Sequence, residues 1–541
     1  MNNIKDKLAL MAPSLVFGEG EPLTVTVPAG QFRDVAKSLR DDPQMRFDLL
    51  LCMTGMDWGE TLGVVYHLRS TELGHEIVLR TETADRENPE LQSAYDLWES
   101  ANLTEREVYD FFGIRFTGHP DMRRLYLRND WVGYPFRKDY NASPDVNPVR
   151  LDSDETLDTA PAYELKDGKV EKHENVLFEN DEYVVNIGPQ HPATHGVLRF
   201  RVSLAGETVQ KVDVHCGYSH RGIEKMCESL TYPQTLALTD RLDYLSAHQN
   251  RHALCMCIEQ AMGIEIPERV QYIRTIMDEL NRLSSHLLFW STLCMDLGAL
   301  TAFFYGFRDR EIVLDMMEET TGGRLIQNYN MIGGVAADIH PNLVKRVKDF
   351  IKYLPKMLDE YDEVFTGNVI AQQRLKGIGI LPKEVAVSYG VTGPSGRASG
   401  WSCDVRKLKP YGVYDKVQFD EVIRTGGDSF DRYLVRVDEI RQSLHILEQL
   451  IDNIPAGDYA VKTKPIIRLP EGQFFSSVEA SRGEFGVYIE SRGDKFPYRM
   501  KFRSPGLPLV SVVDYLASGS KIADLIAIGG SLDYVVPDID R

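Results

Sequence analysis

The pattern of hydrophobic and polar positions first predicts a small domain of mixed α and β structure. Residues 47–58, 62–71 and 75–83 are alternating or β-branched runs at short spacing, which is typical of a β-meander. Helical segments are expected at 92–100 and 104–112, the second with Thr104 as N-cap and Glu107 three residues later. Residues 118–140 combine Pro, Gly, Arg and aromatic residues without periodicity. We therefore expect an α/β domain over 1–140 that ends in an extended arm.

The pattern then changes at residues 141–181, which are rich in Asp, Glu and Pro and contain few large apolar side chains. Such a segment buries too little apolar surface to offset the entropic cost of ordering. We predict an acidic linker without secondary structure between two domains.

A second domain, over 182–541, is predicted to begin with strands at 182–188, 197–204 and 209–215. Long helical patterns follow at 233–262, from Pro267 to Leu287, and at 343–361 and 430–451, which indicates a helical-bundle core. Two strand-like runs, 483–493 and 498–505, return near the end of the chain. The fold class is therefore α+β, with β elements flanking the bundle.

One apolar stretch raises the question of a membrane span. It begins at His286 and reads HLLFWSTLCMDLGALTAFFYGF, with Asp296 in its middle. A charge at that place is costly in hydrocarbon, so a buried core helix is the better interpretation. The apolar run before Gly18 is too short for a secretory signal.

Composition narrows the class of partner. The formal net charge of -19 argues against nucleic-acid binding, which requires a basic face. The 7 cysteines include no C-x-x-C pair, which is typical of a reducing compartment.

Several catalytic or metal-binding patterns are incomplete. His215, Cys216 and His220 lie within six residues, but no fourth ligand or second ligand pair is visible, so no metal site is predicted. Cys255 and Cys257 lie on a predicted buried helix. The Gly-rich segment 390–400 has no G-K-[ST], and the chain has no G-x-S-x-G elbow.

Three polar residues remain as candidates for chemistry. His195 lies in the loop GPQHPATHG (188–196), while Tyr244 and Asp296 lie in apolar helical settings. A buried carboxylate needs a partner or stays protonated, and a histidine presented by a loop can supply one. A core tyrosine and a helix-capping aspartate are the alternatives, and spacing alone leaves both open.

Longer motifs resemble known proteins. The D (49-kilodalton-type) subunit of respiratory complex I, a proton-pumping quinone oxidoreductase, resembles this chain at GPQHPATHGVLR, HRGIEK, TDRLDY, LGALTAFFY and SLDYVVPDIDR. Its C (30-kilodalton-type) subunit resembles residues 105–140. Together the motifs imply a fused C–D chain that covers nearly everything outside the linker.

The same resemblance implies a fold related to the nickel-iron hydrogenase large subunit. The four thiolate positions that hold nickel in those enzymes fall on Asp243, Ser246, Val535 and Asp538. None of these residues carries sulfur, so the resemblance implies that no metal is bound by this chain. Arg221 is expected beside a 4Fe-4S cluster that an adjacent B-type subunit holds.

In that family the corresponding cavity takes the head of a quinone. The resemblance implies that His195 and Tyr244 each hydrogen-bond one quinone carbonyl and supply protons. It also implies that Asp296 pairs with His195 and couples the reaction to proton pumping. His191 is implied to line the quinone path. The implied partners are B-type and I-type iron-sulfur subunits and H-type and A-type membrane subunits. The implied location is the cytoplasmic side of a bacterial inner membrane, as a peripheral subunit. The electron donor stays open, and it could be NADH, ferredoxin or another carrier. The choice between menaquinone and ubiquinone stays open too. Two alternative functions of the chain also remain, a structural scaffold without catalysis and a hydrogenase.

Overall fold

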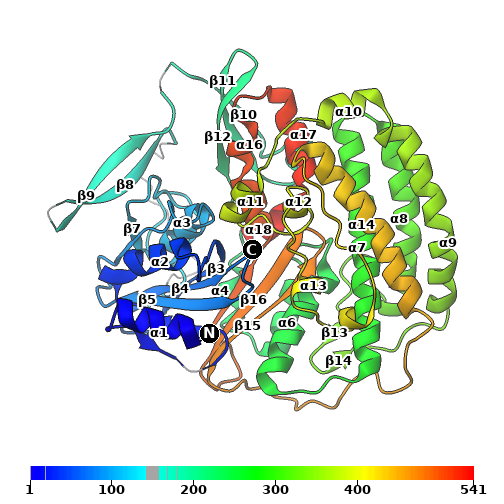
Figure 1. Ribbon diagram of the computed structural model, residues 1–541, viewed down its shortest axis with the longest axis horizontal. Coiled ribbons are helices and arrows are strands. Elements are labelled where there is room, and N and C mark those ends of the chain that lie inside the picture. The colour runs from blue at the N-terminus through cyan, green and yellow to red at the C-terminus, as the bar shows by residue number, and fades with distance from the viewer. Residues whose placement is uncertain (1, 19, 142–156, 167, 180) are drawn as a thin grey trace.

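The computed structural model describes residues 2–18, 20–141, 157–166, 168–179 and 181–541. Its N-terminal part is a five-stranded sheet in the order β1-β2-β5-β4-β3, in which β2 pairs parallel to β5 and the other pairs are antiparallel (Figure 1). The predicted meander is confirmed as β3, β4 and β5. The elements of this part are α1 (Asn2–Met11), β1 (Val16–Phe17), β2 (Leu23–Thr26), α2 (Phe32–Asp41), β3 (Leu49–Asp57), β4 (Leu62–Arg69), β5 (Glu76–Thr83), β6 (Glu90–Gln92), α3 (Ala101–Phe112) and β7 (Arg115–Thr117).

Of the two helices predicted between 92 and 112, the first is wrong and the second, 104–112, is confirmed as part of α3. A single helix, α3, begins at Ala101, and the segment before it is held in turns because Glu105 accepts hydrogen bonds from Ser93 Oγ (2.6 Å) and from the backbone N–H of Ala94 (2.7 Å). Thr104 is not the N-cap. It lies inside the helix, and its hydroxyl donates to the carbonyl of Ser100 (2.8 Å), the back-bond that threonine often makes within helices.

Residues 118–140 form the extended arm that the sequence predicted. No named helix or strand of the described chain falls within it. Arg123 makes two hydrogen bonds to Asp213 (2.8 and 3.0 Å), and the Tyr126 hydroxyl donates to the carbonyl of Ile539 (2.9 Å). The arm therefore joins the N-terminal sheet to the last residues of the chain.

The prediction that 141–181 lacks secondary structure is wrong for its second half. An antiparallel hairpin of β8 (Thr159–Lys166) and β9 (Lys169–Val176) projects from the body of the molecule in Figure 1. Its base docks on the arm, where the N–H groups of Met122 and Gly118 donate to the carbonyls of Pro161 and Tyr163 (2.8 Å each). Backbone pairing thus orders a segment that is poor in apolar side chains. Residues 142–156 of the predicted linker lie outside the described residues.

The three strands predicted at the start of the second half are confirmed. They form the antiparallel sheet β10 (Tyr183–Ile187), β11 (Arg199–Ala205) and β12 (Thr208–His215). The two later strand predictions are confirmed within a second antiparallel sheet of β15 (Gly472–Ala480), β16 (Gly483–Ser491) and β17 (Arg499–Arg503). This second sheet lies between the N-terminal part and the helices (Figure 1).

Helices α7, α8, α9 and α14 form the predicted bundle, seen on the right of Figure 1. The bounds of the helices and short strands of this half are α4 (Ile223–Cys227), α5 (Tyr232–Thr239), α6 (Ala247–Met262), α7 (Glu268–Asp296), α8 (Leu300–Thr321), β13 (Asn330–Met331), β14 (Gly334–Val335), α9 (Leu343–Tyr361), α10 (Val369–Leu375), α11 (Lys383–Tyr389), α12 (Gly393–Arg397), α13 (Val405–Leu408), α14 (Ser429–Leu450), α15 (Gly506–Ser511), α16 (Val513–Ala517), α17 (Ile522–Leu532) and α18 (Val536–Asp540).

The apolar stretch from His286 is not one helix, which corrects its interpretation. It is divided between α7, which ends at Asp296, and α8, which begins at Leu300, with Gly298 in the left-handed region (φ +85°) between them. Glycine reaches that conformation without the steric cost of a Cβ atom. Within the described part of the chain, no helix is both long and apolar enough to cross a bilayer.

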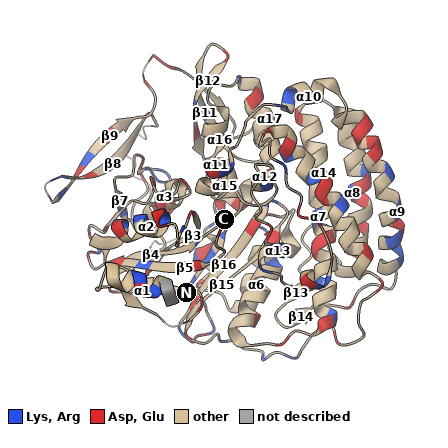
Figure 2. Cartoon of the chain, in the orientation of Figure 1, with Lys and Arg blue, Asp and Glu red and all other residues tan. Residues whose placement is uncertain are grey.

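The buried apolar residues that the structure describes form two large hydrophobic cores and one small cluster around Met56 and Tyr488. One large core runs from Ile4 of α1 to Ile539 of α18, so the two halves share it, and the other fills the helical bundle. A buried ion pair crosses the same boundary, with Arg69 of β4 bonded twice to Glu484 of β16 (2.7 and 2.8 Å). On the outside of the bundle, α8 and α9 carry both acidic and basic residues (Figure 2), and Arg346 of α9 pairs with Glu319 of α8 at 2.7 Å.

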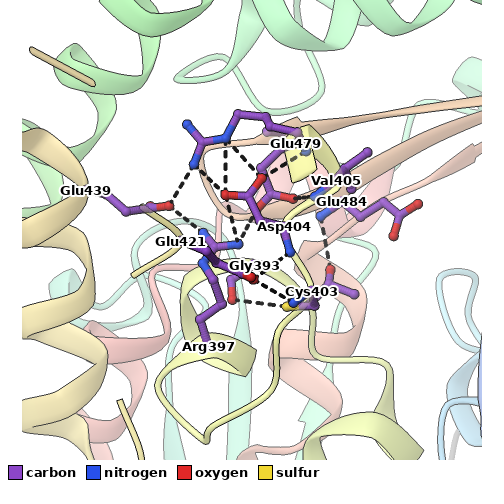
Figure 3. A network of polar contacts seen from close by, with 12 residues as sticks. Gly393, Arg397, Cys403, Asp404, Val405, Glu421, Glu439, Glu479 and Glu484 are labelled. Atoms are coloured by element: carbon purple, nitrogen blue, oxygen red, sulfur yellow. Dashed lines mark hydrogen bonds and ion pairs between the residues drawn. The ribbon is translucent and has the colours of Figure 1, made fainter. Parts of the chain in front are cut away.

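A network of buried charges fixes the end of β15 to the bundle (Figure 3). Arg397 of α12 donates to Glu439 of α14 (2.5 Å) and to Glu479 of β15 (2.7 Å). Arg406 pairs with Asp404 (2.7 Å) and contacts Glu439 as well (3.2 Å). Each arginine has carboxylate partners, which offset the cost of burying its charge. The β15–β16 hairpin is therefore held in place at its tip.

Candidate functional site

The loop 188–196 has a fixed shape. Pro192–Thr194 is a 3₁₀ turn, and the Thr194 hydroxyl contacts the carbonyls of His191 (2.7 Å) and Gly196 (2.9 Å). His195 ends the turn in the left-handed region (φ 51°), which is unusual for a residue other than glycine. At Gly196 a Cβ atom would lie 2.6 Å from Val536, so only glycine lets the loop pack on α18. This packing directs His195 toward the interior.

The side chain of His195 forms a hydrogen bond with that of Asp296. The distance between Nε2 and Oδ2 is 2.7 Å, and the two side chains are 15% and 4% exposed. Burial favours the neutral imidazole, but the hydrogen bond and charge of Asp296 outweigh it and raise the pKa of His195. Gly530 of α17 packs on the same carboxylate, since a Cβ atom there would lie 2.8 Å from Oδ2. The carboxylate thus binds the histidine rather than capping α7.

Tyr244 lies in the turn between α5 and α6 and is half-buried. Among the described residues its hydroxyl makes no hydrogen bond that would account for it as a satisfied core tyrosine. Burial raises the pKa of Tyr244, and the positive charge of Arg482 opposes that rise. Arg482 and Asp533 also act on His195, so the phenol and the imidazole share one electrostatic environment.

Arg482 is a residue that the sequence analysis missed. It lies at the tip of the β15–β16 hairpin, is 1% exposed, and pairs with Asp243 (3.0 Å) and Asp533 (3.0 Å). These two aspartates belong to the motifs TDRLDY and SLDYVVPDIDR. A signal existed, because an aspartate that is buried requires a partner such as a cation, and both motifs contain aspartates next to apolar residues.

Two further groups near the site were also missed. Tyr534 has a ring centroid 6.3 Å from that of His195, and its buried hydroxyl has no partner among the described residues. Asp538 accepts hydrogen bonds from Ser504 Oγ (2.5 Å) and the N–H of Gly506 (2.9 Å). Burial and the nearby charge of Asp243 raise the pKa of Asp538 to about 6.

Among the described residues, neither of the two remaining candidates, His191 and Arg221, has a hydrogen bond to His195, Asp296 or Tyr244. His191 is exposed, and its Nδ1 accepts a hydrogen bond from the N–H of Ala193 (3.2 Å). Arg221 is exposed too, and it donates to the carbonyl of Arg241 (3.4 Å). Their roles in a quinone path and beside an iron-sulfur cluster stay predictions.

The His215, Cys216 and His220 side chains point to three separate partners. His215 Nε2 contacts Asp213 (2.7 Å), His220 Nδ1 contacts the carbonyl of Asp540 (2.6 Å), and the Cys216 thiol faces the carbonyl of Leu125 (3.7 Å). Across the ranges that the structure describes, no group of three His, Cys, Asp or Glu residues has an arrangement that could hold a metal ion.

Comparisons with known proteins match both halves of the chain. The family described as the 49 Kd subunit of the respiratory-chain NADH dehydrogenase matches residues 296–468 and 464–541, and the 30 Kd subunit family matches residues 25–146. The NADH-quinone oxidoreductase C/D subunit of Phocaeicola vulgatus is 66% identical over 519 residues, covering 96% of this chain and 99% of the relative.

More distant relatives give the same result. The NADH-quinone oxidoreductase C/D subunit of Nitrosospira multiformis is 37% identical over 88% of this chain and 83% of its own length. The unfused D-type subunit of the same enzyme from Geobacillus kaustophilus is 44% identical over 366 residues, which are 68% of this chain and 100% of the relative. The chain therefore belongs to the family of fused 30-kilodalton-type and 49-kilodalton-type subunits of complex I, the NADH-quinone oxidoreductase C/D subunits.

Proposed function

We propose that this complex I subunit binds the quinone head and supplies the protons for its reduction. The observation that carries the proposal is the buried pair of His195 and Asp296, built by a loop and a helix end that are 101 residues apart. A histidine held by a carboxylate suits general acid catalysis, and so does a tyrosine in the same electrostatic environment whose hydroxyl has no hydrogen-bond partner among the described residues.

The geometry of the pair assigns a role to each ring nitrogen of His195. Nε2 of His195 is hydrogen-bonded to Asp296 at 2.7 Å, so Nδ1 of the same ring is available to bind a substrate. In a neutral imidazole that donates from Nε2, Nδ1 can only accept a hydrogen bond. The charged form donates from both nitrogens. Asp296 favours that form, so Nδ1 can donate to one quinone carbonyl.

Tyr244 would donate to the other carbonyl. Two-electron reduction of a quinone leaves two oxyanions, and each must gain a proton to give the quinol. The imidazolium of His195 gives one proton and the phenol of Tyr244 gives the other, and both groups are then reprotonated from solvent. A phenol, whose ordinary pKa is about 10, donates to a strongly basic reduced quinone.

Asp296 would carry the signal for proton pumping. When His195 loses its proton, the buried carboxylate loses its counter-charge and must move or gain a proton itself. An Asp296→Asn variant that reduces quinone and still pumps protons normally would rule this step out.

The same proposal covers the partners, the location and the domain organisation. Electrons would arrive from a 4Fe-4S cluster that an adjacent B-type subunit holds near Arg221. The other partner subunits would be of the I, H and A types. His191 would line the path of the quinone. The chain would be a peripheral subunit on the cytoplasmic side of a bacterial inner membrane, with NADH or another electron donor bound elsewhere. We keep the division into 1–140, 141–181 and 182–541, and the hydrogenase-like fold of the last part, as parts of this proposal.

Labelling with a photoreactive quinone analogue tests the site. Membranes that contain the assembled complex would be irradiated with the analogue, with and without excess quinone, and the labelled peptides identified. We expect labelling of the peptides that carry His195 and Tyr244, and competition by quinone. Labelling confined to other subunits would contradict the proposal.

A further inference from the structure

We propose that Arg482 is a positioning residue for quinone reduction, which holds the Tyr244 turn and the segment after α17 at fixed places around His195. This inference rests on the proposed function. No motif of the sequence analysis contains Arg482, and the argument for it comes from its contacts.

Arg482 joins segments that are far apart in the chain. Its two terminal nitrogens bind Asp243 (3.0 Å) and Asp533 (3.0 Å), and Nε donates to the carbonyl of Asp533 (2.6 Å). Nη1 also contacts Ser285 Oγ of α7 at 3.0 Å. Each of these contacts leads to a residue of the site. Asp243 precedes Tyr244, Asp533 precedes Tyr534, and helix α7, which carries Ser285, ends at Asp296. A planar guanidinium can bind several acceptors in fixed directions, which an ammonium group cannot do.

The arginine is itself held firmly. Ser481, its neighbour in the two-residue turn, donates twice to Gln249 Oε1 of α6 (3.0 and 3.1 Å). The carbonyls of Glu479 and Ala480 accept from Arg282 of α7 (2.7 and 3.2 Å). The charge network of Figure 3 fixes the Glu479 side chain on the same strand. The hairpin tip is therefore a rigid support for Arg482.

Asp533 shows why such a support is needed. It adopts the left-handed conformation (φ 61°), which costs free energy for a residue other than glycine. Arg482 binds both its carbonyl and its carboxylate, and so stabilises the turn that directs Tyr534 toward His195.

Arg482 also belongs to the set of charges that face the two proton donors. His195 is faced by Asp296 and Asp533, which raise its pKa, and by Arg482, which lowers it. Tyr244 is faced by Arg482 and Arg310, which lower its pKa, and by Asp243 and Asp533, which raise it. Loss of the cation and loss of Asp533 should thus shift the pKa of His195 in opposite directions.

The test compares four variants in membranes that contain the assembled complex. Arg482→Lys keeps the charge but cannot span both carboxylates, Arg482→Met removes the charge, and Asp533→Asn keeps the shape of its partner. The matched control is Arg274→Lys, a buried arginine at the other end of α7 that binds Glu259 twice (2.7 and 2.9 Å) and two carbonyls. It lies 22 residues before Asp296, about 33 Å along the helix. Rates are normalised to the amount of assembled complex.

We expect Arg482→Lys to lower kcat for a water-soluble quinone about tenfold, since a misplacement of the reacting groups by about 1 Å costs up to about a hundredfold in rate. Arg274→Lys should leave kcat unchanged. In the pH profile of kcat/KM, the alkaline limb should move to higher pH in Arg482→Met and to lower pH in Asp533→Asn. Structural damage alone would not give opposite shifts.

The inference would be overturned if Arg482→Lys behaved like Arg274→Lys, or if both charge variants moved the profile in the same direction. A failure of the proposed function has a different signature. In that case His195→Gln and Tyr244→Phe would reduce quinone at the rate of the unmodified complex, whatever the Arg482 variants do.

Discussion

His195 and Asp296 form a hydrogen bond of 2.7 Å between residues 101 positions apart, one at the end of a 3₁₀ turn and the other at the end of α7. The carboxylate is 4% exposed, so its charge acts on the imidazole with little screening by solvent. Asp296 raises the pKa of His195, and in the proposed function the pH dependence of quinone reduction follows from this pair.

The Asp296→Asn variant tests this relationship. In the folded protein Asp296 raises the pKa of His195, so the imidazolium persists to higher pH than in a free histidine. Without the carboxylate the imidazolium is lost at lower pH. We expect the alkaline limb of quinone reduction to move to lower pH, with a loss on the order of tenfold at pH 8 and a smaller loss at pH 6.

Asp315→Asn on α8 is the control, since Asp315 pairs with the surface residues Arg324 and Arg346. An Asp296→Asn profile that overlays that of this control would show that Asp296 does not set the protonation of His195.

Replacement of Tyr244 by phenylalanine removes the hydroxyl and keeps the ring. Because the phenol is assigned as a proton donor, kcat for quinone reduction should fall on the order of a hundredfold, while the complex assembles normally. Steady-state kinetics of membranes with equal amounts of complex provide the measurement. Tyr515→Phe, at a tyrosine that is 46% exposed, is the matched control and should keep the original rate. Equal rates in the two variants would remove Tyr244 from the mechanism.

Asp538 predicts a pH dependence of stability. Its pKa in the folded state is about 6, above the ordinary value of 3.8, because of burial and the charge of Asp243. The folded state therefore holds a proton that the unfolded state has released between these values, and stability falls as pH rises through this window. Asp538→Asn removes this loss, and asparagine can still accept from Ser504 and Gly506.

Relative to the unmodified chain, Asp538→Asn should gain on the order of 2 kcal/mol in free energy of unfolding between pH 4 and pH 7.5. Denaturant unfolding at both pH values measures it. A difference between the two proteins that does not change with pH would contradict the assignment.

The ion pair between Arg69 and Glu484 predicts strong coupling between the two halves of the chain. Arg69→Met leaves a buried carboxylate without its partner and should cost about 3–5 kcal/mol of stability. The double variant Arg69→Met/Glu484→Gln should cost less than the sum of the two single changes. Arg46→Met, which breaks an exposed pair with Glu72, is the control and should cost under about 1 kcal/mol. Additive effects in the double variant would show that the buried pair is not coupled.

Much of the fold could be predicted from local patterns. The strands of the N-terminal meander and the helices of the bundle have periodic burial, and periodicity is a local property of the sequence. The hairpin 159–176 was missed because composition reports on side-chain burial, whereas backbone pairing and docking on the arm order this segment. The division of the apolar stretch at Gly298 was missed because its hydrophobicity continues through the turn.

The site could be predicted only in part. A buried Asp296 needs a partner, which indicated a histidine presented by a loop. The family resemblance then identified His195, whereas the spacing of residues in the sequence could not identify it. Arg482 has no sequence relation to Asp243 or Asp533, because it reaches them from a hairpin tip 239 and 51 residues away. Contacts of that kind depend on the complete fold, as does the approach of Tyr534 to His195.

A structure of the assembled complex with a bound quinone analogue tests the central claim most directly. The account predicts that His195 Nδ1 and the Tyr244 hydroxyl each lie about 3 Å from a different carbonyl oxygen of one ring, with Asp296 still on Nε2. A headgroup bound elsewhere, or an imidazole and a phenol too far apart to reach the same ring, would contradict it.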